Sequence, residues 1–264
     1  MKKWNRARRF GAAWLLAAAV SVNVPGNAGF PVLRAEAAQA DSAEKTVSPS
    51  FDVSKFVLPA SAAVLVVVEG TGGYGCNVYA YEWSGGPGGA WQERLSTTGI
   101  LGKNGLSNHR TSGDKTTPIG LFEMNTPFGQ SKAEEGFPEN YVQVSGDYVW
   151  SDLTNTLKQG SDDPGEKVGT SRYAGYYDYA IDAGFNRAAM ENQGSALFLH
   201  CMGPYSQGTS GCVAIPKEEM AKIMKLYGTY GDGCAFIAQA PAGTFDQIYS
   251  TFGANGGLSP DGNF

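Results

Sequence analysis

The chain has 264 residues, with 20 Lys and Arg against 25 Asp and Glu, and its formal net charge is −5. This acidic balance argues against binding nucleic acid or anionic lipid through bulk charge. The 36 glycines follow no fixed period, so they indicate frequent turns in a globular domain and exclude a fibrous repeat.

Residues 1–37 have the pattern of a signal peptide. A basic start is followed by an apolar stretch at 11–22, and the small residues Ala35 and Ala37 suit cleavage. The apolar stretch is shorter than the ~20 residues that span a bilayer, which favours cleavage over an uncleaved interfacial anchor. Cleavage would remove six basic residues and one acidic residue, lowering the net charge from −5 to −10. We therefore expect an exported, extracytoplasmic protein without stable membrane insertion.

A domain of β-sandwich type is expected at residues 60–240, after a polar leader segment at 38–59. Val-rich and alternating runs separated by glycine turns predict a three-stranded antiparallel meander. Its strands are expected at 62–69, 76–83 and 91–97. A loop at 99–117 should follow, with His109 exposed because no neighbour would orient it, and 118–124 should return to strand.

The middle of the chain predicts two polar connections, at 128–140 and 151–171. The second is longer than most ordered loops, so it is a candidate lid over a substrate groove or a mobile insertion. An alternating aromatic run at 173–182 predicts a long strand. Its tyrosines, including Tyr179, would either line a groove for substrate or pack in the core.

The stretch from Gly194 to Pro216 carries the candidate chemistry. Two apolar runs, at 196–199 and 213–215, flank a turn-rich loop and predict two neighbouring strands. His200 ends the first run, and Cys212 comes directly before the second. An adjacent imidazole lowers the pKa of a thiol and accepts its proton, which produces a nucleophilic thiolate.

Gly211 removes a side chain where a substrate carbonyl would approach the sulfur. Backbone N–H groups around Ser210 and Gly211 are therefore candidates for an oxyanion hole. The alternative is that Cys212 is an inert core residue among small and apolar neighbours, with His200 merely hydrogen-bonded.

One convincing helix is expected, at 217–227, with Gly228 as its stop, packed on the sheet behind Cys212. A closing strand at 234–240 and a glycine-rich tail at 241–264 should follow. Four apolar residues of the tail could form a short docking helix: Phe245, Ile248, Tyr249 and Phe252.

Four cysteines in an exported protein raise the question of disulfides. If Cys212 is a free nucleophile, one disulfide is possible among Cys76, Cys201 and Cys234, and the sequence does not select the pair. A zinc site could instead use His200 and three of the cysteines (Cys201, Cys212 and Cys234). Adjacent residues on a strand point to opposite faces, which disfavours this site.

The region around Cys212 resembles the active-site signature of the L,D-transpeptidase family, the cysteine acyltransferases that cross-link bacterial peptidoglycan. In that family a strand histidine is followed, after a loop, by Ser/Thr-x-Gly-Cys, and His200 with the TSGC sequence at 209–212 matches this pattern. The segment GDKTTPIGLFEM at 113–124 is similar to the strand that enters the catalytic sheet of the family. The resemblance extends over about 60–240. Ser210 stands where many members have a second histidine.

The resemblance implies an L,D-transpeptidase-like β-sandwich with one or two short helices packed near the catalytic loop. It also implies that Cys212 is the nucleophile, that His200 is the base, and that Thr209 and Tyr179 are candidates for substrate contacts. The substrate would be a peptidoglycan stem tetrapeptide that loses a D-alanine, and carbapenems would be inhibitors. No metal or organic cofactor, no nucleic acid and a monomeric state are expected.

Three alternatives remain at this point. Water in place of an acceptor amine would make the protein an L,D-carboxypeptidase that uses the same pair of residues. The domain could also be a catalytically weak module that binds the cell wall, or a structural protein stabilised by metal.

Overall fold

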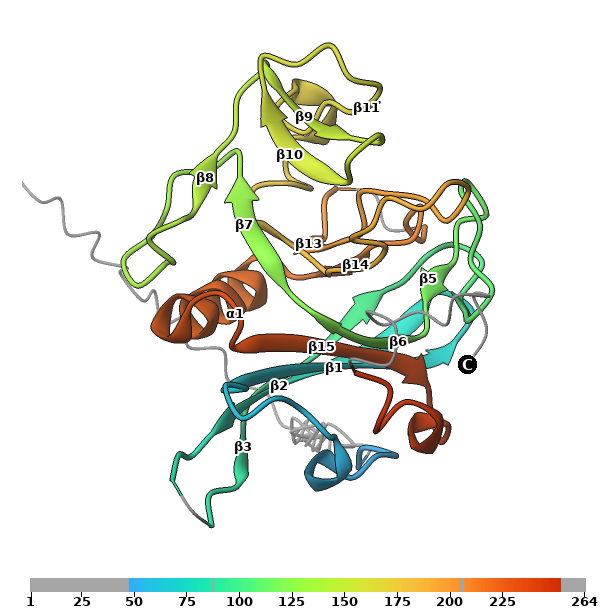
Figure 1. Cartoon of the computed structure of the whole chain (residues 1–264), viewed down its shortest axis with the longest axis vertical. Helices are drawn as coiled ribbons and strands as arrows, with labels where there is room; N and C mark the ends of the chain where they lie inside the picture. The colour runs from blue at the N-terminus through green and yellow to red at the C-terminus, as the bar shows by residue number, and fades with distance from the viewer. Residues whose placement is uncertain (1–47, 87, 205–206, 253–264) are drawn as a thin grey trace, which may run out of the picture. The chain divides into compact units, whose positions relative to one another are not determined.

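The computed structural model describes residues 48–86, 88–204 and 207–252. The expected signal peptide at 1–37 lies outside the described residues. The described residues form a mainly β structure with a large mixed sheet and a single α-helix, α1 (Figure 1). No helix within these residues has the length and apolar character required to cross a membrane.

The large sheet has ten strands in the order β6-β15-β1-β2-β3-β14-β13-β12-β7-β8. Their bounds are Val64–Gly72 (β1), Gly75–Trp83 (β2), Trp91–Ile100 (β3), Gly120–Glu123 (β6), Asn125–Gly129 (β7), Val142–Gln143 (β8), Ala180–Asp182 (β12), Phe198–Cys201 (β13), Val213–Ile215 (β14) and Ala235–Pro241 (β15). The antiparallel pairing of β1, β2 and β3 confirms the predicted meander. The expected closing strand, β15, is not at an edge, because it pairs in parallel with β1 and antiparallel with β6.

The two halves of the large sheet share one core. Alternate residues of β1, β2, β13 and β14 contribute to the same buried cluster, which we call the central core. Val66 and Val78 come from one half of the sheet, and Leu199 and Ile215 come from the other; all four side chains are fully buried. Each such burial contributes about 1.5–3 kcal/mol. The strand order and this shared core make the sheet a sandwich, in agreement with the expected class.

Helix α1 (Lys217–Tyr230) follows β14 and packs on the central core through Met220, Ile223 and Tyr227. The helix runs through Gly228 and ends at Gly231, which has a φ of 80°. The prediction that Gly228 is the stop was therefore wrong. A Cβ at Gly228 would lie 2.4 Å from the carbonyl oxygen of Gly136, so this glycine allows a loop to pack closely against the helix.

The segment expected as a polar connection at 151–171 instead contributes to a second, small sheet. Its strands are β9 (Tyr148–Ser151), β10 (Thr156–Gln159) and β11 (Gly165–Glu166), with β9 in the centre. Figure 1 shows the small sheet on the side of the molecule where β13 and β14 lie. A two-stranded sheet of β4 (Leu106–Ser107) and β5 (Thr117–Pro118) closes the loop that precedes β6.

The aromatic run at 173–182 is not one long strand, as the sequence predicted. A 3-10 helix, η2 (Ser171–Tyr173), and turns occupy most of it, and only β12 pairs in the sheet. Gly175 has a φ of 81°, which places it in the left-handed region and turns the chain. The Asp178 side chain accepts a hydrogen bond from the Gly175 N–H and stabilises this turn.

Segments near both ends of the described chain pack together on the outer face of β1, β2 and β15. Phe51 and Phe56, within the expected leader segment, contact Phe245 edge-on or at a tilt, with ring centroids 5.0 and 6.2 Å away. The flanking 3-10 helices are η1 (Val53–Lys55) and η3 (Phe245–Gln247). The short docking helix expected in the tail is therefore present as η3, and Phe245 and Ile248 are buried.

Candidate active site

Strands β13 and β14 place His200 and Cys212 on the same face of the large sheet. The two strands are neighbours, as predicted, and the structure shows that they pair in parallel, with His200 opposite Ala214. Leu199 and Cys201 point into the central core, whereas His200 and Phe198 point to the opposite face. Cys212 packs with Phe198 on that face, so both candidate catalytic side chains lie on it.

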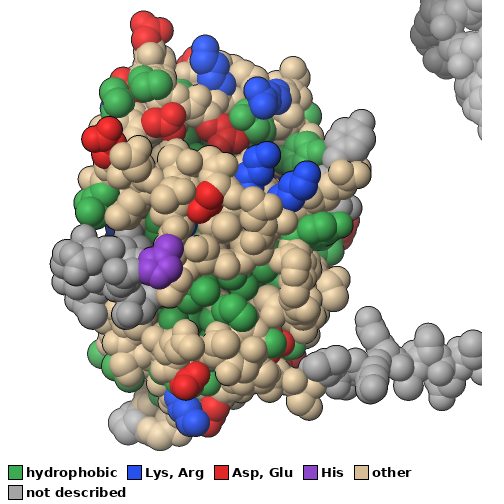
Figure 2. All heavy atoms as spheres, turned by 90° about the vertical axis from the view of Figure 1, so that its right-hand side faces the viewer, with side chains coloured by type: hydrophobic (Ala, Val, Ile, Leu, Met, Phe, Trp, Pro, Cys, Tyr) green, Lys and Arg blue, Asp and Glu red, His purple; other side chains and the backbone are tan. Residues whose placement is uncertain are grey.

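His200 and Cys212 line one open cavity of about 1130 Å³, which we call the Cys212 cavity. Segments from both sheets and from the loops before β5 and β13 contribute to its wall. The charged lining residues are Arg110, Asp152, Glu166 and Arg172. Figure 2 shows acidic and basic side chains interspersed over the upper part of the face it presents. Glu166 lies in β11 and Asp152 directly follows β9, so the small sheet adds two acidic groups to the wall of the cavity.

The Cys212 side chain is held by the segment that precedes β13. The Phe198 N–H donates to Sγ over 3.3 Å, and the thiol donates to the Ala196 carbonyl oxygen over 3.4 Å. The residue is 7% exposed, and burial raises the pKa of the thiol to about 12. The Glu166 carboxylate adds to this rise in pKa, whereas the Phe198 N–H and the Arg110 charge oppose it. At neutral pH the free protein therefore holds Cys212 as a neutral thiol.

His200 is also buried and neutral. Burial lowers its pKa to about 4, although the carbonyl groups of Cys201 and Tyr176 favour the protonated ring. Nδ1 lies 2.8 Å from the Cys201 carbonyl oxygen; since a carbonyl can only accept, the neutral tautomer has its lone pair on Nε2. The Tyr177 ring packs edge-on against the imidazole, with centroids 5.2 Å apart. His200 thus has the protonation state of a general base.

No hydrogen bond joins His200 to Cys212 among the described residues; each is bonded to backbone groups instead. Catalytic hydrogen bonds in unliganded enzymes are often long or absent and form when substrate binds. The arrangement is that of an uncharged base and an uncharged thiol that share a cavity.

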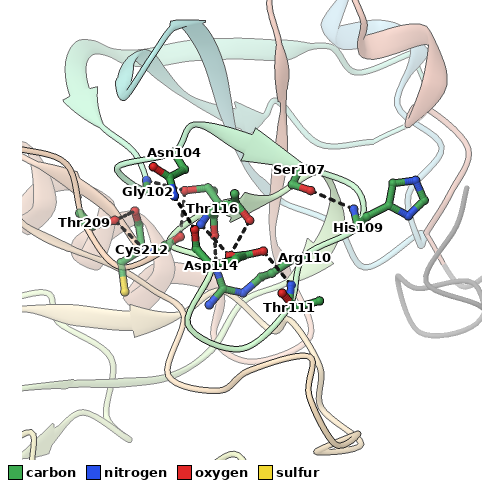
Figure 3. A network of polar contacts seen from close by, with 12 residues as sticks. Gly102, Asn104, Ser107, His109, Arg110, Thr111, Asp114, Thr116, Thr209 and Cys212 are labelled. Carbon is green, nitrogen blue, oxygen red and sulfur yellow. Dashed lines mark hydrogen bonds and ion pairs between the residues drawn. The ribbon is translucent and has the colours of Figure 1, made fainter.

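The loop before Cys212 depends on Gly211 and Thr209. Gly211 has a φ of 140°, and a Cβ there would lie 2.4 Å from Arg110 Nη1 and 2.8 Å from the Thr116 carbonyl oxygen. Thr209 Oγ1 accepts from the Gly211 N–H over 3.0 Å and donates to the Cys212 carbonyl oxygen over 2.6 Å (Figure 3). The hydroxyl of Thr117 donates to the Gly211 carbonyl oxygen over 2.9 Å.

These contacts modify two expectations from the sequence. The Gly211 N–H is occupied by Thr209 and is not available for an oxyanion, whereas no hydrogen bond of the described residues uses the N–H of Ser210 or Cys212. The Thr209 hydroxyl stabilises the turn, although the residue does line the cavity. The N–H groups of Ser210 and Cys212 therefore remain as the candidate backbone donors for an oxyanion.

Tyr179 does not line the cavity. Its ring packs against Phe137 at 5.0 Å, and its hydroxyl donates to Glu134 over 2.9 Å. The tyrosines that do line the cavity come from the same aromatic run, namely Tyr173, Tyr176 and Tyr177. The substrate contact expected of Tyr179 thus has no geometric support, because the run turns before β12.

The carboxylate of Glu166 was missed in the sequence, because it lies in the segment taken as a connection. Tyr177 OH donates to it over 2.5 Å, and the Tyr173 ring is stacked on Tyr177 with centroids 4.8 Å apart. Burial raises the Glu166 pKa, and the two tyrosine hydroxyls counter part of that rise.

The other histidine, His109, is exposed as expected, and its side chain points away from Cys212 (Figure 3).

All four cysteines are free thiols. Cys76 and Cys201 are buried in the central core, and Cys201 faces away from His200, as the alternation of a strand requires. Within the described ranges no group of three or more His, Cys, Asp and Glu side chains could hold a metal ion.

No protein family matches the chain, and no curated protein matches it. Among solved structures, the chain is similar to that of Bdellovibrio bacteriovorus Bd1075, with a TM-score of 0.36 and 14% identity. The similarity covers 67% of this chain and 47% of the other, so this chain spans about half of the length of that protein. The function must therefore be inferred from the site itself.

Proposed function

We propose that the protein is an exported cysteine acyltransferase that acts on peptidoglycan stem peptides, as an L,D-transpeptidase. The observation that supports this most is that His200, on β13, and Cys212, directly before the neighbouring parallel strand β14, line the same open cavity. The resemblance of TSGC at 209–212 and of the segment at 113–124 to that family supplies the substrate class. The protein is proposed to act as a monomer outside the cytoplasm, without a cofactor and without nucleic acid.

In the proposed reaction His200 takes the Cys212 proton when substrate fills the cavity. The thiolate attacks the carbonyl carbon of the third residue of a stem tetrapeptide, and the N–H groups of Ser210 and Cys212 donate to the resulting oxyanion. The C–N bond then breaks, and the imidazolium returns its proton to the departing D-alanine amine. A thioester remains on Cys212, and an amine of a second stem takes the acyl group.

The neutral resting pair is compatible with this chemistry. In a buried site a thiolate and an imidazolium would each have to be stabilised by the opposite charge of the other. Neither ion is present until the proton moves from Cys212 to His200. Substrate that displaces water from the cavity would bring the imidazole and the thiol into one hydrogen-bonded unit. Proton transfer and attack would then be coupled.

Acylation by a carbapenem tests the proposal. Incubation of the purified protein should add the mass of one opened carbapenem, and peptide mapping should locate it on Cys212. The Cys212→Ser variant should remain unmodified, and His200→Gln should react much more slowly. No adduct, together with binding to isolated sacculi, would instead favour a wall-binding module.

Product analysis then separates transfer from hydrolysis. With a tetrapeptide and an acceptor stem, a transpeptidase yields a cross-linked product, whereas an L,D-carboxypeptidase yields only the tripeptide and D-alanine.

A further inference from the structure

Glu166 places a carboxylate in the wall of the Cys212 cavity. The residue lies in β11, is partly buried and lines the cavity together with Cys212 and His200. Its Oε1 accepts from the Tyr177 hydroxyl over 2.5 Å, and burial raises its pKa. A carboxylate that is largely withdrawn from water normally has a cationic partner, because an unpaired buried charge is costly.

The two arginines of the cavity do not supply this partner. Arg110 forms its ion pair with Asp114, and Arg172 lies over the Tyr173 ring, 5.6 Å from the ring centroid. No ion pair between described residues includes Glu166. The Arg172 charge lowers the pKa of Glu166, but less than the tyrosine hydroxyls do. The carboxylate therefore lines the cavity without a cation in direct contact.

A single aromatic side chain separates Glu166 from the candidate catalytic residues. The Tyr177 hydroxyl bonds to Glu166, and the Tyr177 ring packs edge-on against both His200 and Phe198, with centroids 5.2 and 5.5 Å apart. The N–H of Phe198 in turn donates to the Cys212 sulfur over 3.3 Å. The carboxylate thus lies close enough to act on charges that form beside the sulfur.

The Glu166 charge opposes the first half of the proposed reaction. After burial, it is the largest cause of the raised Cys212 pKa, because a carboxylate and a thiolate repel each other. The pKa of His200, in contrast, responds to burial and to two backbone carbonyl groups. A negative charge in this place would instead favour a step in which another positive charge enters the cavity.

We propose that Glu166 binds the ammonium group of the acyl acceptor and takes one of its protons. Acceptor binding is the step of the proposed reaction that brings a cation beside the sulfur, and an ammonium to carboxylate contact is a strong, charge-assisted hydrogen bond. This inference rests on the proposed function and assigns a residue to its second half.

The proton transfer makes the acceptor a nucleophile. One proton of the ammonium passes to the Glu166 carboxylate, and the neutral amine attacks the carbonyl carbon of the thioester. As the C–N bond forms, His200 takes a second proton from the nitrogen. The C–S bond then breaks, the Cys212 sulfur receives the proton from the imidazolium, and Glu166 releases its own proton to water.

Stem peptides offer a primary ammonium group from two sources. The acceptor stem carries the amine that becomes acylated, and the third residue of the donor stem can carry a side-chain amine of its own. Both have the same chemistry, and acetylation of each in turn separates them.

Binding to the Cys212→Ser protein tests the inference without turnover. The probes are an acceptor tripeptide with a free side-chain amine on its third residue and the same tripeptide acetylated at that amine. Calorimetric titration should show about 10-fold tighter binding of the free amine. Glu166→Gln in the same background keeps an acceptor for the Tyr177 hydroxyl but removes the charge, so it should bind both probes equally.

Asp163→Asn is the matched control. Asp163 lies between β10 and β11 of the same small sheet and bonds to Ser151 and Lys158, outside the residues that line the cavity. Its substitution should leave the preference for the free amine unchanged.

In the protein that retains Cys212, Glu166→Gln should affect the two half-reactions in opposite directions. Acylation by a carbapenem should be at least as fast as in the parent, because no carboxylate opposes the thiolate. With a donor acetylated at its side-chain amine, so that only the acceptor has one, formation of the cross-linked product should fall at least about 10-fold. Damage to the fold would instead slow both half-reactions.

Three results would overturn the inference: no preference for the free amine in the Cys212→Ser protein, a preference that persists after Glu166→Gln, or a loss of cross-linking only when the donor amine is free. If a carbapenem acylates Cys212 while the preference survives Glu166→Gln, only the inference fails. If no adduct forms but the preference depends on Glu166, the proposed function fails and the ammonium site stands.

Discussion

In the protein without substrate, the candidate catalytic side chains of His200 and Cys212 are both uncharged and do not form a thiolate–imidazolium ion pair. Burial raises the pKa of the Cys212 thiol to about 12 and lowers that of His200 to about 4. Between these values both groups are uncharged. In the absence of substrate, Cys212 should therefore react slowly with electrophiles, because only a small fraction of the thiol is ionised.

Alkylation by iodoacetamide checks this state. Because the thiol is protonated below its pKa, the thiolate fraction, and with it the labelling rate at Cys212, should rise about tenfold per pH unit between pH 7 and 10. Peptide mapping by mass spectrometry would follow Cys212 separately from the other cysteines, with Cys212→Ser as the blank. A rate that levels off below pH 8 would mean that a preformed ion pair exists.

Gly211 is required both by its backbone and by its surroundings. Gly211→Ala should destabilise the fold by at least about 2 kcal/mol and abolish carbapenem acylation, because the new Cβ would collide with Arg110 and the Thr116 carbonyl. Gly113→Ala is the control, since Gly113 also has a positive φ, 80°, but has open space around it. It should cost about 1 kcal/mol and leave acylation intact, as measured by urea unfolding and mass spectrometry. Equal effects of the two variants would contradict this account.

At the residue scale, the sequence predicted that Cys212 and His200 lie close together, and they line the same cavity; it did not predict the charged residues of the cavity wall. Cys212 and His200 lie at the borders of two apolar runs. Any fold that pairs these two runs as neighbouring strands brings the two residues close together. Arg110 and Glu166 reach the cavity only because loops distant in sequence fold over it. Tyr179 lies outside the cavity for the same reason, since a turn determines which tyrosines of the run face it.

At the scale of the elements, the buried side-chain amide of Asn155 holds the small sheet in place. Asn155 Oδ1 accepts from Trp150 Nε1 over 2.7 Å and from the Ala196 N–H over 3.1 Å. Its Nδ2 donates to the carbonyl oxygens of Phe185 and Asn186 over 2.8 and 3.0 Å. The amide thus ties the small sheet to the segment that leads into β13.

Asn155→Ala should therefore cost about 2–4 kcal/mol and loosen the wall of the cavity, because it leaves several buried groups unpaired. Asn140→Ala provides the comparison, since that amide bonds to Asp232 at an exposed position and its loss should cost less than about 1 kcal/mol. Urea unfolding gives the stabilities, and hydrogen exchange should show faster exchange in β9 and β10 for Asn155→Ala alone. If the amides of β9 and β10 exchange at the same rate in both variants, the Asn155 side chain does not hold the small sheet to the segment before β13.

The regular strands and α1 were predictable from periodicity, whereas the elements at 151–171 and 173–182 were not. Strands β10 and β11 are short and polar, and they pair with β9, whose buried Trp150 donates to the amide of Asn155, rather than forming through an apolar repeat. Gly228 was misassigned for a related reason: the sequence does not distinguish a glycine required for close packing from a glycine that ends a helix.

On the scale of the whole molecule, one buried carboxylate should make stability depend on pH. Burial raises the Asp182 pKa to about 7, while the N–H of Gly184, Asn125 and the Arg187 charge act against this. Oδ1 has no hydrogen-bond partner within the described part of the chain, and Oδ2 accepts from Asn125 over 2.9 Å. In the unfolded chain the group ionises near pH 3.8. Stability from the neutral acid is thus complete below pH 3.8 and is lost as the pH rises through about 7.

Asp182→Asn should consequently raise the free energy of unfolding at pH 8 by on the order of 3 kcal/mol and leave it nearly unchanged at pH 4. Urea midpoints at the two pH values measure this. Asp147→Asn is the control, because hydrogen bonds from Ser145 and Gln159 lower the pKa of that exposed carboxyl and its removal should not stabilise the protein at pH 8. An Asp182→Asn protein that is no more stable than the parent at pH 8 would mean that the carboxylate is well solvated when charged.

The mainly β class was predictable from the whole chain, because many short alternating runs separated by turns fit few other classes. The strand order was predictable only in part, since the sequence predicted that β13 and β14 are neighbours but did not predict the parallel pairing of β1 with β15. No local signal in the sequence specifies such long-range partners.

The interior position of β15 has a consequence for biosynthesis. Residues 235–241 insert between β1 and β6, so the sheet cannot close until these residues have been synthesised. Pairing across so many residues makes loop closure costly and folding slow. A nascent chain stopped before this strand would present two unsatisfied edges, and it should aggregate or be degraded rather than accumulate as a shortened protein.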